Sequence, residues 1–328
     1  MFSPAPSPNR FSRPSIFLGS WWVCVVLAPW ASAQILDPIE TAAEIVGRAV
    51  TARESLQSGR VSYREIIGVN AKSESRIHVV FDGSSIRTER ITTAAGSGGA
   101  PAVHMRHGAI RNGALWTQYS GTGNDPAQWR VHSEVFDPSE DSEATGASYD
   151  PRLFRTGAIP RTWSPRSRLR EYMSLPYILL TEPIVGQTPT GVWLLAGKRK
   201  RPFDAQIVFE CDERRGWSIL NIQVTRRVPL ADGSLERWVH KSVIEPDQYG
   251  EFWFPARFVM TKEVDGKLRQ RCELATSAAE FNIEIEPHEF TLRGIKGLPS
   301  GVRVTRSFEG NETRIWNGTK LVETETRP

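Results

Sequence analysis

The sequence lacks a marked excess of charge, a second long apolar run and the common catalytic motifs. It has 41 Lys and Arg against 37 Asp and Glu, an excess too small and too scattered to indicate nucleic-acid binding. Beyond residue 33 no apolar segment approaches the roughly 20 residues of a membrane-spanning helix. Helix-favouring runs of Ala and Leu are rare, whereas 11 Trp and 14 Phe are present. This composition favours an all-β or α+β protein.

Residues 1–33 have the pattern of a cleavable signal peptide. Arg10 and Arg13 precede a short apolar core over residues 16–30, and Ala31-Ser32-Ala33 follows as a cleavage signal. The core has about 15 residues, fewer than a spanning helix needs, so cleavage is favoured over an uncleaved anchor. We expect a periplasmic or secreted chain that begins at Gln34 and carries 39 basic residues (41 − 2) against 37 acidic ones.

An amphipathic helix and a long train of strands should follow. Pro38 suits a first helical turn, the apolar stripe ends at Arg53, and Ser58-Gly59 stops the helix. The stripe consists of Ile39, Ala42, Ala43, Val46, Ala49 and Val50, widened by Ile45, Ala52 and Leu56. Alternation and turn residues predict strands over 61–67, 76–81, 85–92, 104–106, 114–119, 129–132, 192–196, 205–211, 217–225, 235–244, 252–260, 267–275, 302–307 and 313–316.

The stretch from Leu235 to Leu292 is the most informative. Its strands are separated by turns at 245–250 and at Val264-Asp265-Gly266, which predicts an antiparallel meander. One face of the second strand carries Phe252, Phe254, Ala256, Phe258 and Met260, and the other carries Trp253, Pro255, Arg257 and Val259. Because both faces are partly apolar, this strand needs cover on each side, and the helix supplies one layer.

Two segments fall outside this pattern. The glycine-rich residues 94–101 should be a flexible loop rather than a phosphate cradle, because no Gly-Lys-Ser/Thr and no helix follow. Residues 136–165 are polar, and an excursion of that length is either functional or disordered. Residues 168–180 suggest a second short helix interrupted near Pro176.

The residue types that carry chemistry are not arranged as a site. His104 and His107 would lie on opposite faces of a strand and could not chelate one metal. Gly-x-Ser-x-Gly and His-Glu-x-x-His motifs are absent, and Glu284 and Glu286 read as a solvated strand face alternating with Ile283 and Ile285. We therefore expect no catalytic residue, no metal and no cofactor; an enzyme with a site built from the long loop is the open alternative.

The basic run Lys198-Arg199-Lys200-Arg201 has two interpretations. It is a solvated turn after the strand over 192–196, or it contacts anionic lipid headgroups, where each such residue contributes on the order of 1 kcal/mol. The second interpretation would give the protein a transient contact with a membrane surface.

Cys211 and Cys272 are the two cysteines of the mature chain. Export and an even number favour a disulfide. In a simple meander, however, three strands separate them, about 19 Å at roughly 4.8 Å per strand, whereas a disulfide needs Cα atoms about 4.4–6.8 Å apart. We predict two buried free thiols.

Three parts of the chain resemble the periplasmic lipoprotein-carrier (LolA/LolB-like) superfamily of outer-membrane lipoprotein-sorting proteins. They are the opening helix with Ser62-Tyr63-Arg64-Glu65, the strand segment from Tyr249 to Phe258, and the tail through Phe281-Asn282-Ile283 and Phe290-Thr291-Leu292. The resemblance implies a strongly curved antiparallel sheet, an incomplete barrel, with helices against its concave face. It also implies acyl-chain carriage as the activity. The 136–165 insertion and a C-terminal extension depart from the family pattern.

We therefore expect an α+β domain over residues 34–292, an extension over 293–328, and a non-enzymatic protein that carries or senses an apolar ligand, a lipid or lipoprotein acyl chain. Trp193, Phe254 and Phe258 are the predicted ligand contacts, although alternation cannot say which face of each strand looks inward. The alternative is a protein-interaction or sensor module whose helices fill the concavity.

Overall fold

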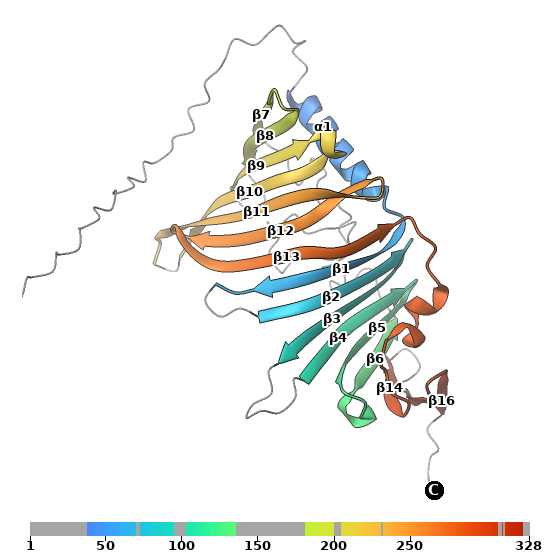
Figure 1. The fold of residues 1–328 in the computed structure, drawn as a ribbon. Helices are drawn as coiled ribbons and strands as arrows, with labels where there is room; N and C mark the ends of the chain where they lie inside the picture. Colours follow the sequence, from blue (N-terminus) through green and yellow to red (C-terminus); the bar gives the residue numbers. More distant parts are fainter. Residues whose placement is uncertain are drawn as a thin grey trace, which may run out of the picture. The chain divides into compact units, whose positions relative to one another are not determined.

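The computed structural model describes residues 38–69, 73–94, 103–135, 181–199, 205–230, 232–307, 310 and 312–323. Within these ranges it contains one α-helix and sixteen strands (Figure 1). Their bounds are α1 Pro38–Glu54, β1 Ser58–Ile67, β2 Ser73–Asp82, β3 Ser85–Ala94, β4 Val103–Asn112, β5 Leu115–Thr122, β6 Arg130–Val135, β7 Thr181–Gln187, β8 Val192–Arg199, β9 Ala205–Asp212, β10 Ser218–Pro229, β11 Leu235–Tyr249, β12 Phe252–Val264, β13 Lys267–Phe281, β14 Val302–Arg306, β15 Glu312–Trp316 and β16 Leu321–Glu323. Short 3-10 helices are η2 Pro126–Gln128, η5 Glu213–Arg215, η6 Pro287–Phe290 and η7 Leu292–Gly294.

All sixteen strands belong to one open sheet in the order β16-β15-β14-β6-β5-β4-β3-β2-β1-β13-β12-β11-β10-β9-β8-β7. Neighbouring strands along β1–β6 and along β7–β13 pair antiparallel, which confirms the predicted meander. Two features lie beyond that prediction. β1 pairs with β13 and joins the two trains, and β14 runs parallel to β6. The C-terminal strands thus extend the same sheet.

The α1 helix packs its apolar stripe on one face of this sheet, beside β7 and β10 (Figure 1). Ala42, Ile45, Val46, Ala49 and Val50 are all buried there. Burial of side chains of this kind contributes about 25 cal/mol per Å² of apolar surface, and this packing is what stabilises so short a helix. The stripe does not end at Arg53 as predicted, because the Arg53 side chain is itself buried.

The two faces of the sheet are distinct. The face that contacts α1, here called the α1 face, carries Val61, Phe81, Phe209, Phe254 and Leu274 among its buried residues. The opposite face, here called the C-terminal face, packs Val80, Ile110, Tyr119 and Val131 against Ile285, Phe290 and Ile295 of the C-terminal segment. Two apolar cores therefore lie on opposite sides of one sheet.

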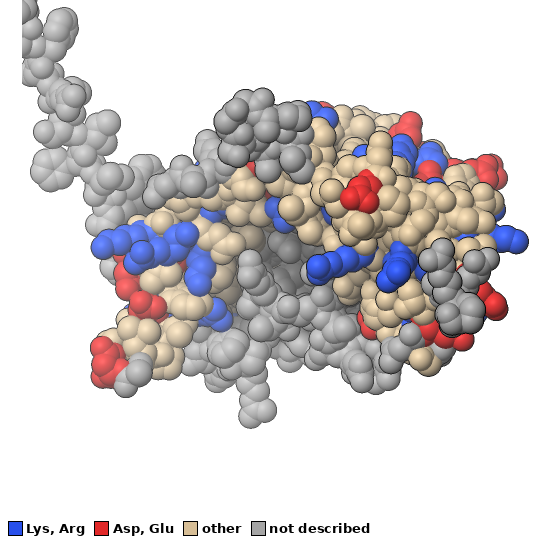
Figure 2. All heavy atoms as spheres, turned by 90° about the horizontal axis from the view of Figure 1, so that it is seen from below, with Lys and Arg blue, Asp and Glu red and all other residues tan. Residues whose placement is uncertain are grey.

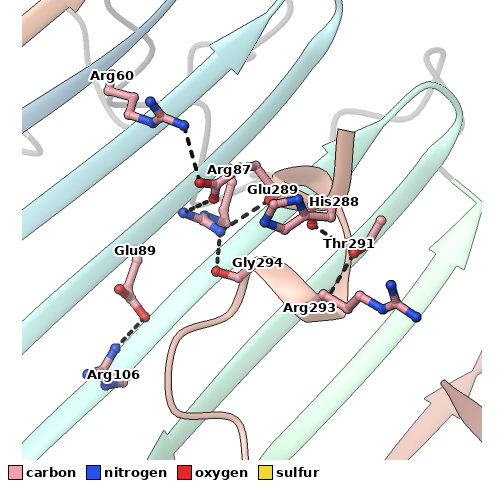
Figure 3. A network of polar contacts seen from close by, with 9 residues as sticks. All are labelled: Arg60, Arg87, Glu89, Arg106, His288, Glu289, Thr291, Arg293 and Gly294. Atoms are coloured by element: carbon pink, nitrogen blue, oxygen red, sulfur yellow. Dashed lines mark hydrogen bonds and ion pairs between the residues drawn. The ribbon is translucent and has the colours of Figure 1, made fainter. Parts of the chain in front are cut away.

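An arginine fastens the C-terminal segment to the sheet (Figure 3). Arg87 Nη2 of β3 lies 2.7 Å from Glu289 Oε2 of η6. Its Nη1 donates to the carbonyl oxygens of Glu289, at 3.2 Å, and of Gly294. Arg60 on β1 also approaches Glu289, with 3.4 Å between Nη2 and Oε1. One guanidinium thus satisfies carbonyl groups of two short helices that have no strand partners.

Several sequence predictions need correction. The predicted turn at 245–250 is wrong, because β11 continues to Tyr249 and the turn is Gly250-Glu251; Pro246, which has no N–H, sits where the pairing with β12 shifts register. Residues 283–286 form no strand, although Ile285 is buried while Glu284 and Glu286 are exposed.

Other predictions fall outside the described residues or on a different element. The proposed second helix over 168–180, the 136–165 excursion and most of the 94–101 loop lie outside the described residues. Lys198 and Arg199 belong to β8 rather than to a turn, and residues 200 and 201 are not described.

Candidate functional site on the α1 face

The register of the sheet places the three predicted contact residues, Trp193, Phe254 and Phe258, on the α1 face. Phe254 and Phe258 have exposed fractions of 0% and 1%, while Trp193 is half-buried and its Nε1 donates to Glu213 Oε2 at 2.8 Å. Three strands separate β8 from β12, so Trp193 lies apart from the two phenylalanines, although all three belong to the same apolar core.

Phe254 lies at the α1 end of this face. Its ring is 4.9 Å from the ring of Phe281 and 6.2 Å from that of Tyr249. The Arg53 guanidinium lies over the same ring, 5.0 Å from its centroid. Phe254 is therefore packed against the helix, whereas Phe258 lies further along β12, opposite Ile244 and Leu274.

Beyond α1, a row of directly opposed side chains crosses seven neighbouring strands of the α1 face, about 29 Å at roughly 4.8 Å per strand. We call it the apolar row, and it consists of Leu195, Phe209, Ile222, Ser242, Met260, Cys272 and Ile67. Ser242 is the one hydroxyl in it. Its exposed fraction is 0%, and its Oγ has no hydrogen-bond partner in the structure as described.

The next positions along the same face are polar. Trp238 and His240 of β11 stand opposite Arg226 of β10 and Lys262 of β12. We call these four residues the basic cluster. Arg226 Cζ lies 4.6 Å and Lys262 Nζ 3.5 Å from the centroid of the Trp238 ring, so one indole takes up two cations. The Trp238 Nε1 donates to Glu236 Oε2 at 2.9 Å.

The four residues of the basic cluster are half-buried, and this partial burial shifts the pKa values of its three ionisable members. The pKa of His240 is lowered to about 4, first by desolvation and then by the charges of Arg226 and Lys262. The pKa of Lys262 is lowered by desolvation and then by Arg226, and that of Arg226 by desolvation. His240 Nε2 is buried and has no hydrogen-bond partner among the residues that the structure describes. At neutral pH His240 is uncharged.

A buried ion pair lies beside the apolar row on β1 and β3. Glu65 has an exposed fraction of 1%, and Arg90 Nη2 lies 2.8 Å from its Oε2. A carboxylate buried to this extent needs such a partner, because an isolated buried carboxylate is so costly that it would bind a proton and become neutral.

Sequence reasoning did not find the basic cluster. Each of its charged residues reads as a solvent-facing position when it is seen in its own strand. The phase of β11 was the available signal, since Trp238, His240, Ser242 and Ile244 alternate onto one face with a buried residue at the end.

Other predicted features are placed as follows. His104 and His107 lie on opposite faces of β4, as predicted, and His104 Nδ1 is 3.0 Å from Thr93 Oγ1. Within the described ranges, no group of three or more His, Cys, Asp or Glu residues is arranged to hold a metal ion. None of the helices in these ranges has both the length and the apolar character needed to cross a membrane. Figure 2 shows that Lys and Arg side chains lie in separate groups and not in one continuous patch.

No family model and no curated protein matches the chain. Solved structures similar to it include a LolA superfamily protein from Nitrosomonas europaea, 13% identical over 77% of this chain and 99% of that one, with a TM-score of 0.39. A DUF1329 family protein from Desulfovibrio piger is 8% identical over 80% and 100%, with a TM-score of 0.41. LprF from Mycobacterium bovis is 10% identical over 75% and 96%, with a TM-score of 0.28.

Proposed function

We propose that this protein is an exported, non-enzymatic carrier or sensor of an apolar ligand, a lipid or lipoprotein acyl chain, held against the α1 face of a curved sheet. The observation that carries the proposal is the apolar row. It extends over seven strands, whereas α1, the one α-helix in the described ranges, lies beside β7 and β10. Five of its seven side chains, Leu195, Phe209, Ile222, Ser242 and Cys272, are buried, so the ligand that we propose would lie in the apolar interior of this face and not on an open surface.

The magnitude of apolar burial is sufficient for binding through apolar contacts alone. Each methylene group transferred from water to an apolar surface contributes about 0.8 kcal/mol. A chain of about a dozen methylenes would therefore provide on the order of 10 kcal/mol before the cost of ordering the ligand is subtracted. Such a gain requires no charged contact deep on the face, and it agrees with the apolar character of Phe209, Ile222 and Met260.

The experiment is extraction of the purified exported protein with organic solvent, followed by mass spectrometry of the extract and binding of a fluorescent fatty-acid probe. We expect a copurifying lipid, or saturable probe binding in material stripped of it. Met260→Gln on the α1 face should weaken probe binding, whereas Val259→Gln, the neighbouring position on the opposite face of β12, should not.

The outcome also separates the proposal from its rivals. No extracted lipid and no probe binding by the parent protein would contradict the carrier proposal. Copurification of a stable protein partner in that case would favour an interaction module with a filled core. Equal effects of Met260→Gln and Val259→Gln would show that the probe does not lie on the α1 face.

A further inference from the structure

We infer that Arg226, His240 and Lys262 form a subsite for an anionic head group, a phosphate or carboxylate, of an amphipathic ligand whose apolar part lies on the apolar row. This inference rests on the proposed function and specifies the chemical class of the ligand. The three side chains project from the same face of adjacent strands β10, β11 and β12, around the Trp238 ring.

The basic cluster carries more positive than negative charge. Directly opposed positions in an antiparallel pair have Cβ atoms about 4.5–5.5 Å apart, so the paired positions of Arg226 and Trp238, and of His240 and Lys262, form a compact group. Two cations share the Trp238 ring, and one carboxylate, Glu236, lies beside them. Glu236 accepts from the indole N–H and its charge also acts on Lys262, so the local balance is two cations against one carboxylate. Lys262 has no ion pair within the described residues. The cluster therefore has an excess of positive charge that an anion would neutralise.

The second step is the unused hydrogen-bonding capacity. His240 Nε2 and Ser242 Oγ are both buried without a hydrogen-bond partner in the described part of the chain. A buried polar atom that makes no hydrogen bond costs about 1–3 kcal/mol, and such atoms are rare in native proteins. Both belong to β11 and both face the α1 side, so a ligand oxygen beside them would satisfy a donor that the protein itself leaves unused.

The third step is the join between polar and apolar surface. Ser242 stands in the apolar row between Ile222 and Met260, and His240 is the next residue of β11 on the same face. About 7 Å along the strand, two residues at roughly 3.4 Å each, takes a ligand from the apolar row into the basic cluster. A molecule with an anionic head and an apolar chain matches this order of surfaces, and a wholly apolar molecule does not use the cluster.

The test compares three probes on the exported protein: phosphatidic acid, the neutral diacylglycerol with the same chains, and inorganic phosphate. Phosphatidic acid should bind about tenfold or more tightly than diacylglycerol. Lys262→Gln, and Arg226→Gln as a second variant, should remove most of this preference while leaving diacylglycerol binding within about twofold. Lys241→Gln is the matched control, because Lys241 precedes Ser242 on β11 but is exposed on the opposite face.

The titration of His240 distinguishes a binding site from a cluster that is only structural. It is followed by NMR and assigned with His240→Gln. A bound anion stabilises the imidazolium, so the pKa of His240 should rise from about 4 when phosphatidic acid is added. The same rise with inorganic phosphate alone would support the subsite and identify a free anion as a sufficient ligand.

The failures of the two proposals are distinguishable. Equal binding of both lipids with an unchanged pKa of His240 overturns the anion subsite and leaves the apolar carrier standing. Binding of neither lipid overturns both proposals. A loss of phosphatidic acid preference in Lys241→Gln equal to that in Lys262→Gln would show that general surface charge, and not the cluster, is responsible, which also overturns the subsite.

Discussion

The Arg53 guanidinium lies over the ring of Phe254, 5.0 Å from its centroid, with both side chains buried between α1 and the sheet. No carboxylate of the described residues lies within ion-pair distance of Arg53. Burial lowers its pKa to about 10. The α1 face therefore has a buried cation at its helix end, at the opposite end of the strands from the basic cluster.

Replacing Arg53 tests whether this cation contributes to the fold. A cation–π contact contributes about 0.5–2 kcal/mol, but the desolvation of an unpaired charge costs more. Arg53→Met should therefore leave the free energy of unfolding unchanged or raise it by up to about 2 kcal/mol. Urea denaturation measures this; a loss of more than about 2 kcal/mol would show that the charge is favourable where it lies.

The contact between Arg87 and Glu289 should hold the C-terminal segment on the sheet. Arg87→Met leaves the Glu289 carboxylate partly buried beside a single, longer contact to Arg60, and should cost about 2–4 kcal/mol. Limited proteolysis should then cut within residues 287–297 faster than in the parent.

Two further variants sharpen this prediction. In Gly294→Ala the added methyl group would meet Arg87 Nη1 and the Glu289 carbonyl, so it should also speed cleavage. Arg64→Met, in an exposed pair with Glu74, is the control and should change little. Cleavage rates that are the same in all four proteins would contradict the role assigned to Arg87.

The cysteines should titrate as two free thiols. Cys211 and Cys272 are buried and form no disulfide, with three strands between them, as the meander predicted. Burial raises the pKa of Cys211 to about 12, which disfavours the reactive thiolate. The exported protein without reductant should show no fast thiol under native conditions and two in denaturant; finding none in denaturant would mean a disulfide and a different strand order.

Stability should fall with acid because of His240. Folding lowers the pKa of His240 from 6.5 to about 4, so between these values the unfolded chain binds more protons than the folded one. The free energy of unfolding thus rises with pH across this window. The part of it that depends on a neutral His240 is lost as the pH falls from about 6.5 to about 4. His78, whose pKa is also lowered by desolvation, acts in the same direction.

Comparison with a variant isolates the contribution of His240. His240→Gln should reduce the loss of stability between pH 6.5 and pH 4 by on the order of 1–2 kcal/mol, after allowance for the part-exposed ring. Urea midpoints at several pH values measure it. Parallel curves for the parent and the variant would contradict a buried, neutral His240.

Much of the fold could be predicted because the alternation of apolar and polar residues within a strand is visible in the sequence. The runs around 76–81 and 205–211 alternate, and the run over 252–260 is rich in aromatic residues; all three are bounded by turn residues, so their existence and order were correctly predicted. The pairing of β1 with β13 and of β14 with β6 could not be predicted, because each joins segments far apart in the chain.

The candidate site was less predictable because burial there does not follow residue polarity. A charge such as Arg53 reads as the end of an apolar stripe, yet its side chain is buried. Arg226, His240 and Lys262 read as separate solvent-facing positions, and only the register of three strands brings them around Trp238. Phe254 and Phe258 are buried, as large aromatic residues at period two usually are, and their role as ligand contacts stays a prediction.

The most direct test of the account is photo-crosslinking with a fatty acid that carries a diazirine in its chain, followed by peptide mass spectrometry. If an apolar ligand lies on the α1 face, we expect saturable labelling of α1-face positions in β10–β12, near Ile222, Ser242 and Met260, and competition by unlabelled fatty acid. Labels confined to the opposite face of these strands, or labelling that fatty acid does not compete, would contradict it.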